Sequence, residues 1–506
     1  MLQGTMSNAG KTLLATGLCR VFRQDGFRVM PFKAQNMSLN SCVTREGLEM
    51  SRAQVMQAEA AGVEPVADMN PLLLKPTGLT GSQVILQGKV LEDLTAAEFY
   101  RRKAEFRPAI LESWRRVEEQ ADIVVIEGAG SPVELNLRQD DLVNMGFAEL
   151  VDAPVLLIGD IDPGGVFAQL LGTLQLLTEQ ERSRIKGLIV NKFRGDPALF
   201  QEGVKILEER SGLPVVGIVP YTEFALSDED SMSGRLSGER EKGKCLFDIA
   251  VIRYPRISNF TDFDCFDAWQ DMRIRYVIKA EDVGHPDLLI LPGSKNTVED
   301  LLWLKGQGFE PVIRRYAEYG PVMGICGGYQ MLTQMIVDPE QAIEMKGLGL
   351  LDGNTVFFPE KIQRKTEGRI GEMSGLLQEL SDCVVSGYEL HMGRTSPSES
   401  HASISEGSSA ASPDLISPGA VHSLTEQTIL MEKGNVYGTY LHGIFDTLNV
   451  IPALRRAFYR ARGLEPKEEM AKDFPELKER EYDRLAKHLR EALDMKYIYD
   501  LLDQQS

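Results

Sequence analysis

The sequence predicts an α/β fold with two domains, each a mainly parallel sheet flanked by helices. The chain has 506 residues, which is too long for a single hydrophobic core. Short apolar runs of strand length alternate with helical segments in both halves, and this alternation is typical of parallel sheets covered by helices. A glycine-rich segment near the start and a glycine-flanked Cys326 each follow such a run. Each half is therefore expected to contain a tight strand-to-helix turn.

The composition is that of a globular protein without nucleic-acid or membrane partners. Hydrophobic residues make up 43% of the chain and charged residues 25%. The net charge of −19, with no basic block, argues against nucleic acid and anionic membranes. The six cysteines are scattered without a CxxC pair, and neither a signal peptide nor a bilayer-length apolar run is found. We therefore expect a cytoplasmic protein, while the oligomeric state stays open.

Composition shifts divide the chain into four parts. Ser227–Lys244 is rich in Ser, Gly and charge, which predicts a linker. Ser396–Ala420 is rich in Ser, Ala and Pro, which predicts a solvated loop insert. From Pro452 the pattern is helical, with one apolar stripe that is expected to pack within the protein: Tyr482, Leu485, Leu489 and Leu493. The predicted parts are a first domain at 1–226, a linker at 227–246, a second domain at 247–450 and a helical tail at 451–506.

The segment GTMSNAGKT, from Gly4 to Thr12, predicts a phosphate-binding loop that holds ATP. Gly10 lets the backbone close on a phosphate, and the amides of the loop, including that of Ser7, point towards it. Lys11 supplies positive charge, and Thr12 offers a hydroxyl to Mg²⁺. A helical apolar pattern follows at once, so a plain Gly/Ser-rich turn explains the segment less well.

The strand before this loop is short. Only Met1, Leu2 and Gln3 precede Gly4, whereas a central strand usually has about five or six residues. Two explanations stay open: a start codon a few positions upstream, or a trimmed chain.

A carboxylate follows the next strong strand. The apolar run from Asp122 to Ile126 ends in Glu127. The carboxyl ends of parallel strands share one edge of a sheet, so this Glu is expected to face the phosphate loop and to be a second Mg²⁺ contact. A Glu that only caps a turn is the alternative.

Several loops resemble one enzyme family. The extended loop GTxSxxGKT is similar to that of dethiobiotin synthetase and its relatives. PFKAQNMSLNS from Pro31, MNPLLLKP from Met69, GSQVILQG from Gly81 and SNFTDFD from Ser258 together resemble the cobyric acid synthases, glutamine-dependent amidases of cobalamin biosynthesis.

Within these loops, Lys33, Asn36 and Lys75 could face an anionic substrate or phosphates. The resemblance implies that Glu127 binds the metal and that Asn191 lies near the nucleotide base. Pro163 stands where the resembled family usually has Arg, which weakens the case for a cation in that loop.

The stretch PVMGICGGYQML, from Pro321 to Leu332, predicts a reactive cysteine in the second domain. An apolar strand meets a helix at Cys326, and the glycines around it allow the tight turn that exposes a nucleophile. The amides at the start of the helix favour a thiolate and a developing oxyanion. Backbone N–H groups of Gly293 and Gly327 are the oxyanion-hole candidates. The alternative is a small buried cysteine beside a glycine loop.

His442 is the best-placed base for this thiol. It ends the predicted strand VYGTYL, and a thiol with an ordinary pKa of about 8.5 needs a base or cation beside it. The pattern GxCxGxQ with this later His resembles the class I glutamine amidotransferases. Most of these carry a Glu two residues after the His, where this chain has Ile444. Asp446 or Glu389 could orient the imidazole, and His391 stays open between structural and active-site roles.

The two resemblances imply two coupled reactions. Residues 1–226 would bind ATP and Mg²⁺ as an amido-ligase domain, and residues 247–450 would hydrolyse glutamine through a Cys326 thioester. Ammonia would reach an acyl phosphate along a shielded path. The family implies a corrinoid substrate, adenosylcobyrinic acid a,c-diamide, whose b, d, e and g carboxylates are amidated to give adenosylcobyric acid.

Three other kinds of protein share parts of this pattern. The sister enzyme cobyrinic acid a,c-diamide synthase has the same parts and amidates other carboxylates. CTP synthase shares the domain order but keeps a His-x-Glu pair, which Ile444 argues against. A ParA/MinD-like regulatory ATPase with an inactive amidotransferase domain is disfavoured because Cys326 and His442 are both present.

Overall fold

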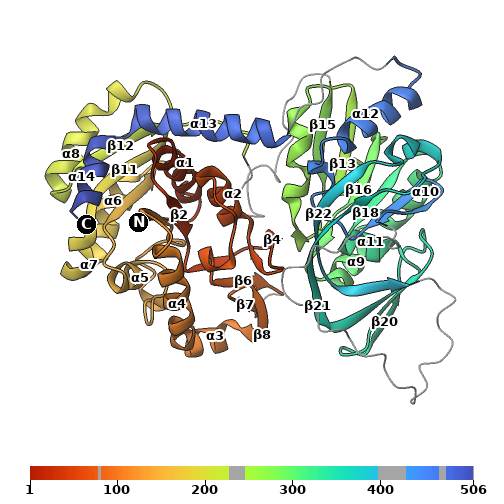
Figure 1. The fold of residues 1–506 in the computed structure, drawn as a ribbon, viewed down its shortest axis with the longest axis horizontal. Coiled ribbons are helices and arrows are strands. Elements are labelled where there is room, and N and C mark those ends of the chain that lie inside the picture. Colours follow the sequence, from red (N-terminus) through yellow and green to blue (C-terminus); the bar gives the residue numbers. More distant parts are fainter. Residues whose placement is uncertain (78–80, 227–244, 397–428, 466–473, 505–506) are drawn as a thin grey trace. The chain divides into compact units, whose positions relative to one another are not determined.

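The computed structural model describes residues 1–77, 81–226, 245–396, 429–465 and 474–504, and these form two compact units (Figure 1). Unit 1 contains Met1–Ser38, Met50–Leu226 and Lys478–Ser506, and unit 2 contains Leu39–Glu49 and Ser227–Leu477. The predicted linker at 227–244 lies outside the described residues, as does the predicted insert Ser396–Ala420 except for Ser396, which ends β22.

The main sheet of unit 1 is parallel. Four strands run in the order β1-β10-β11-β12, and β2 pairs with β9. A parallel bridge between Leu2 and Glu127 brings the end of β9 beside β1. All six residues of β10 are buried, as expected for a strand covered on both faces. The strands are β1 (Leu2–Gly4), β2 (Val29–Phe32), β9 (Ile123–Ile126), β10 (Val155–Asp160), β11 (Ile185–Phe193) and β12 (Val215–Pro220).

Helices flank this sheet, and one set comes from the end of the chain. The apolar stripe of α13, including Tyr482, Leu485 and Leu489, packs in one core with Leu14 and Leu18 of α1. The expectation that this stripe packs within the protein is thus met in unit 1. The helices are α1 (Lys11–Gln24), α2 (Arg52–Ala61), α3 (Ala96–Arg102), α4 (Arg107–Glu118), α5 (Met145–Leu150), α6 (Val166–Leu176), α7 (Glu179–Arg184), α8 (Gln201–Ser211), α13 (Phe474–Ala492) and α14 (Met495–Asp503).

A smaller sheet extends unit 1. Its order is β3-β6-β7-β8, with β3 parallel to β6 and the other pairs antiparallel. These strands are β3 (Gln35–Met37), β6 (Leu72–Pro76), β7 (Gly81–Leu86) and β8 (Lys89–Thr95).

The main sheet of unit 2 has the order β15-β13-β16-β18-β24-β23. Only the pair β23-β24 is antiparallel. Both units therefore have mainly parallel sheets flanked by helices, which confirms the predicted fold class. The strands are β13 (Phe247–Ile252), β15 (Met272–Val277), β16 (Leu288–Leu291), β18 (Val322–Ile325), β23 (Met431–Lys433) and β24 (Val436–Thr439).

Further strands and helices of unit 2 surround this sheet. A second sheet has the order β20-β19-β21-β22, and β14 pairs with β17. Its strands are β19 (Met335–Asp338), β20 (Ile343–Lys346), β21 (Asn354–Arg369) and β22 (Val384–Ser396), with β14 (Ile257–Ser258) and β17 (Gly293–Ser294). The helices are α9 (Thr297–Gly306), α10 (Phe309–Ala317), α11 (Gly327–Leu332), α12 (Val450–Ala461) and the 3₁₀ helix η6 (Phe260–Ala268). None of the helices in the described ranges is both long and apolar enough to cross a membrane.

Two stretches group differently from the predicted domain boundaries. Leu39–Glu49, with β4 (Ser41–Val43) and the start of β5 (Glu49–Ser51), belongs to unit 2 although both flanking segments belong to unit 1. The predicted tail is also divided, since α12 lies in unit 2 whereas α14 and most of α13 lie in unit 1. The chain therefore passes from unit 1 to unit 2 and back twice.

Candidate functional site

The predicted phosphate loop joins β1 to α1. Gly10 has φ +91°, a left-handed conformation that favours glycine, and it ends the loop one residue before the helix. Lys11 Nζ donates to Met6 O at 3.0 Å and to Gly130 O at 3.1 Å. Ser7 is exposed on the same loop. A lysine held over backbone carbonyls beside a left-handed glycine is the arrangement expected for a triphosphate loop.

Glu127 is the centre of a buried polar cluster beside this loop. Its side chain is fully buried, so its charge needs partners. It accepts from Thr12 Oγ1 at 2.7 Å, Lys33 Nζ at 2.8 Å and Gln57 Nε2 at 2.5 Å. Thr12, Lys33 and Glu127, which were predicted from separate motifs, therefore lie together in the structure. A hydroxyl and a carboxylate are the hard oxygen donors that Mg²⁺ prefers, so these residues fit that ion.

The turn at Cys326 is strained. Its backbone has φ +51° and ψ −107°, and it lies between β18 and α11. A non-glycine residue held in such a conformation costs about 1–3 kcal/mol, and strain of this kind is found at reactive sites. Gly328 is required here, because a Cβ at that position would lie 1.8 Å from Leu291 O. The Cys326 side chain is nearly buried, and its Sγ is 3.7 Å from Leu390 O.

His442 is the partner of this thiol. Its Nδ1 donates to Asp262 Oδ2 at 2.7 Å, and Asp262 Oδ1 accepts from the backbone N–H of Gly443 at 3.2 Å. Burial opposes charge on the ring, but the Asp262 carboxylate and a hydrogen bond with Cys326 outweigh it and raise the pKa of His442 to about 10. Cys326, His442 and Asp262 therefore form a thiol–imidazole–carboxylate set.

The two predicted oxyanion-hole glycines lie beside this set. A Cβ on Gly293 would lie 3.2 Å from His442 Cε1, and a Cβ on Gly327 would lie 2.7 Å from the backbone nitrogen of Ser294. The carboxylate of Asp300 accepts a hydrogen bond from Ser294 Oγ at 2.6 Å and so holds the segment that follows Gly293. Burial raises the pKa of Asp300 to about 6, against the hydrogen bond from Ser294 and the charge of Arg256.

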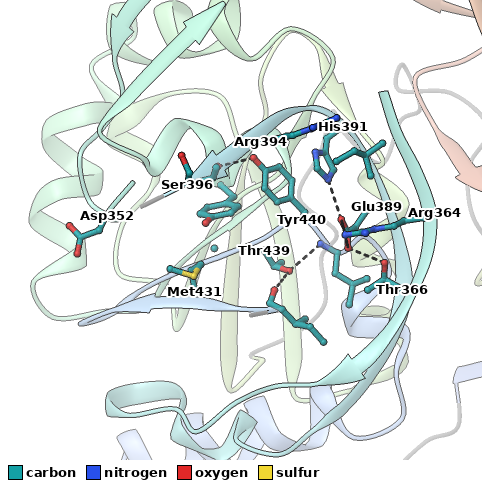
Figure 2. A pocket seen from close by; sticks show the side chains of 16 residues that line it. Asp352, Arg364, Thr366, Glu389, His391, Arg394, Ser396, Met431, Thr439 and Tyr440 are labelled. Carbon is teal, nitrogen blue, oxygen red and sulfur yellow. Dashed lines mark hydrogen bonds and ion pairs between the residues drawn. The ribbon is translucent and has the colours of Figure 1, made fainter. Parts of the chain in front are cut away.

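A cavity of about 460 Å³ lies in unit 2 between the second sheet and β24 (Figure 2). Its polar wall is a network in which Glu389 accepts from Arg364 at 2.9 Å and from Thr366 at 2.9 Å. Burial would raise the pKa of Glu389, but hydrogen bonds from His391 and Thr366 and the charge of Arg364 lower it to about 2. The ring of His391 is stacked on Tyr440 with centroids 3.8 Å apart.

Both halves of the chain match known protein families. Residues 1–233 match the CobQ/CobB/MinD/ParA nucleotide binding domain, and residues 248–450 match the CobB/CobQ-like glutamine amidotransferase domain. Cobyric acid synthase of Ruminiclostridium cellulolyticum is 49% identical over 100% of this chain and 97% of its own length. The chain belongs to the cobyric acid synthase family.

Other relatives agree. Cobyric acid synthase of Clostridium tetani is 47% identical over 99% of this chain and 98% of its own length, and that of Streptococcus sanguinis is 46% identical over 100% and 99%. Among solved structures, a glutamine amidotransferase covers 43% of this chain and 99% of its own, at 19% identity and a TM-score of 0.28. PurLQS from Thermotoga maritima covers 42% and 96%, at 17% identity and 0.27.

Membership of the cobyric acid synthase family defines the general activity. The chain is a glutamine-hydrolysing amidating ligase that acts in cobalamin biosynthesis by a CobB/CobQ-type amidation. Its first domain is a nucleotide-binding domain, as the phosphate loop predicted, and family membership implies the use of ATP.

Other predicted residues of this cobyric acid synthase family member are placed as follows. Asn191 Nδ2 donates to Ala9 O of the phosphate loop at 2.8 Å, so it supports the loop, and its role at the base stays a prediction. Asn36 Nδ2 donates to Ser51 Oγ at 2.8 Å, next to the Glu127 cluster. Lys75 is buried in β6 opposite Gln83.

Asp262 is the site residue that sequence reasoning did not assign. It lies 180 positions before His442, in η6, so no local spacing links the two. Of the two residues that the sequence offered for this role, Glu389 binds His391 and Arg364 instead. The only available signal was the segment SNFTDFD, which contains Asp262 and which supported the family resemblance.

Proposed function

We propose that this enzyme amidates the b, d, e and g carboxylates of adenosylcobyrinic acid a,c-diamide to give adenosylcobyric acid, with glutamine as nitrogen donor and ATP as energy source. The observation that carries the proposal is one chain containing both a Cys326–His442–Asp262 set and a phosphate loop beside Glu127. The corrinoid itself is inferred from the names of the relatives.

Glutamine is hydrolysed in unit 2. The Cys326 thiolate attacks the carboxamide carbon, and the amides of Gly293 and Gly327 stabilise the oxyanion. Protonated His442 gives its proton to the leaving nitrogen, so ammonia leaves and a thioester remains. His442 then takes a proton from water, which attacks the thioester and releases glutamate. Asp262 supports this cycle by holding the imidazole through Nδ1 and favouring its charged form.

The cavity in Figure 2 suits the amino-acid end of glutamine. Its wall contains Arg364 and Arg394, which match an α-carboxylate, and Glu389 and Asp352, which match an α-ammonium group. The pKa of about 2 keeps Glu389 ionised at any physiological pH. Charges of both signs around one cavity favour a zwitterion over a simple amide.

The carboxylate is activated in unit 1. An oxygen of the substrate carboxylate attacks the γ-phosphorus of ATP, and ADP leaves with its electron pair, which gives an acyl phosphate. Ammonia then attacks the acyl carbon, a proton is lost, and phosphate leaves. Lys11 lies where it can neutralise phosphate charge, and the loop amides cradle the phosphates.

Mg²⁺ would bind to Thr12 and Glu127. Bound there, it would neutralise charge on the phosphate oxygens during transfer. Lys33 shares Glu127 Oε1 with Thr12, and Gln57 donates to Oε2, so both oxygens of the carboxylate are already hydrogen-bonded beside the residues that would hold the ion. The cytoplasmic location expected from the sequence belongs to this proposal.

The alternatives predict different products. A cobyrinic acid a,c-diamide synthase would amidate the a and c carboxylates. A ParA/MinD-like regulator would release no glutamate, and the assembled set at His442 disfavours it.

The deciding experiment incubates the protein with ATP, Mg²⁺, glutamine and the corrinoid a,c-diamide, and counts amidations by mass spectrometry. Four additional amides are expected. An unchanged diamide, together with amidation of cobyrinic acid at two positions, would favour the sister enzyme and contradict the proposal. ATP hydrolysis without any amide would contradict both.

A further inference from the structure

The segment Leu39–Glu49 is a short hairpin built into unit 2. The segments on either side of it belong to unit 1. Its strand β4 contacts β21 and β22 of the second sheet of unit 2. A piece of chain from the nucleotide-binding half of the sequence is therefore a structural part of the glutaminase unit.

Glu49 anchors this hairpin. It is fully buried and accepts from Ser41 Oγ at 2.7 Å, Lys361 Nζ at 2.6 Å and Gln363 Nε2 at 3.1 Å. Two of these donors come from β21. A buried carboxylate with a cation and two further donors holds its segment in one position, because any displacement would leave the charge unpaired.

The hairpin contacts two residues of the glutaminase site. The backbone carbonyl of Ser41 accepts from Tyr388 Oη at 3.0 Å and from Asn259 Nδ2 at 3.3 Å. Asn259 Nδ2 also donates to Tyr388 Oη at 3.0 Å. Val43 packs in a small buried cluster with Tyr388 and Leu390.

These contacts lead directly to the predicted nucleophile and base. The ring of Tyr388 is stacked on His442, with centroids 5.3 Å apart and planes at 22°, and the two backbones exchange hydrogen bonds. The carbonyl of Leu390 lies 3.7 Å from Cys326 Sγ.

Asn259 connects the hairpin to Asp262, the carboxylate beside His442. It is the residue immediately before η6, which contains Asp262, and its own φ of +53° is a left-handed conformation. The hairpin therefore touches the neighbours of all three members of the set.

The two ends of the hairpin lead to the Glu127 cluster. Its first residue follows Ser38, one position after β3, and β3 begins two residues after Lys33. Its last residue, Glu49, is followed after two residues by α2, which contains Gln57. Lys33 and Gln57 both donate to Glu127. A shift of either segment when ATP binds would thus pull on the hairpin through a few peptide bonds.

We propose that the hairpin 39–49 is a positioning element through which the state of the ATP site controls glutamine hydrolysis. Ser41 and Val43 fix the positions of Tyr388 and Asn259. Tyr388 in turn positions the ring of His442, and Asn259 positions the start of η6, which contains Asp262. The inference rests on the proposed function. It assigns to the hairpin the coupling between the two sites, by which ammonia is released only when an acyl phosphate can accept it.

The test measures glutamate release by the full-length protein alone, with MgATP, and with MgATP plus the corrinoid a,c-diamide. Wild type should be stimulated about fivefold or more, the range typical of coupled sites. Tyr388→Phe removes the hydroxyl that donates to Ser41 O and accepts from Asn259 Nδ2. It should lower kcat by at least about 2- to 12-fold, the range for each hydrogen bond lost, leave the KM for glutamine unchanged, and bring the stimulation ratio close to one. Val43→Ala, a change within the hairpin, should also lower the ratio.

Tyr316→Phe is the matched control. Tyr316 is a buried tyrosine in α10 of the same unit. Its hydroxyl donates to Pro286 O at 2.7 Å. It should keep the wild-type stimulation ratio. Full stimulation in both Tyr388→Phe and Val43→Ala, or wild-type glutamate release that ignores MgATP and the diamide, would overturn the inference and leave the proposed function intact. Absence of any glutamate release from wild type would overturn both.

Discussion

A buried carboxylate lies next to the reactive residues of each unit, and these two carboxylates are held in different ways. Glu127 of unit 1 accepts from side chains on three segments of the chain: Thr12, Lys33, and Gln54 and Gln57 of α2. Asp262 of unit 2 binds the ring of His442 and the adjoining backbone N–H. Donors that can be exchanged suit a carboxylate that must accept an incoming ion. Fixed partners on two adjacent residues, the ring of His442 and the N–H of Gly443, suit a carboxylate whose task is to orient that ring.

The phosphate loop of unit 1 and the turn at Cys326 in unit 2 also differ in the residue type that adopts a positive φ before the helix. The residue just before the helix has positive φ in both turns: it is Gly10 in the phosphate loop, at φ +91°, and Cys326 in the strand-to-helix turn of unit 2, here called the elbow, at φ +51°. The position before α1 needs no side chain to bind a phosphate through its backbone, so glycine removes the strain there. The elbow must present a thiol, so its strain of about 1–3 kcal/mol is retained.

The largest effect should come from Cys326→Ala. Glutamine-dependent amidation should fall at least about 10³-fold, because the nucleophile is lost, while amidation from added ammonia continues. Product formation with either nitrogen source is measured by mass spectrometry. Cys383→Ala, which changes another buried free cysteine of unit 2, is the control and should remain active. Loss of the ammonia reaction in a folded variant would show that the two sites are not separate.

Asp262→Asn should have the next largest effect. Glutamine hydrolysis should fall about 10²- to 10⁴-fold, since the ring loses the carboxylate that orients and charges it. In wild type the pKa of His442 is raised to about 10, above its ordinary 6.5. Its contribution to stability is therefore fully present below pH 6.5 and is lost as the pH rises to about 10.

The Asp262→Asn variant lacks the stability that the raised pKa of His442 gives to the wild type. Melting temperatures measured from pH 6 to 10 should accordingly show a difference between wild type and Asp262→Asn that shrinks towards alkaline pH. A difference that stays constant over this range would contradict the assigned pair.

Lys11→Ala tests unit 1. Amidation should fall about 10²-fold or more with both glutamine and ammonia, because phosphate charge is no longer neutralised. Basal glutamate release without ATP should persist. Lys89→Ala changes an exposed lysine of β8 and serves as control. Retained ammonia-dependent amidation in Lys11→Ala would place the activation step elsewhere.

The smallest effect on turnover is expected from Leu485→Ala. This buried residue of α13 packs in the core of unit 1, and its truncation should lower the free energy of unfolding of that unit by about 2–5 kcal/mol. Glutamate release at 25 °C should change little. Calorimetry of wild type and variant should show a lower melting temperature only for the transition of unit 1. A matching decrease for unit 2 would mean that the two units unfold together.

The sequence predicted what is local in the chain. The phosphate loop, the elbow at Cys326 and the strand-ending Glu127 are each recognisable within about ten residues, because turn chemistry and strand length act over that span. The pairing of His442 with Asp262 depends on contact across 180 positions and leaves no periodic signal. The hairpin at 39–49 has the polar composition of any loop, so its residues do not indicate which core it joins.

The return of the C-terminal helices to unit 1 has a consequence for synthesis on the ribosome. The apolar face of α1 is covered by side chains of α13, such as Tyr482 and Leu489, which are translated last. Unit 2 is complete in sequence before this point, so it can fold while unit 1 still waits for its last layer. A gene fragment ending at codon 226 would leave that face bare and should aggregate, whereas joining codons 478–506 to it should restore a soluble product.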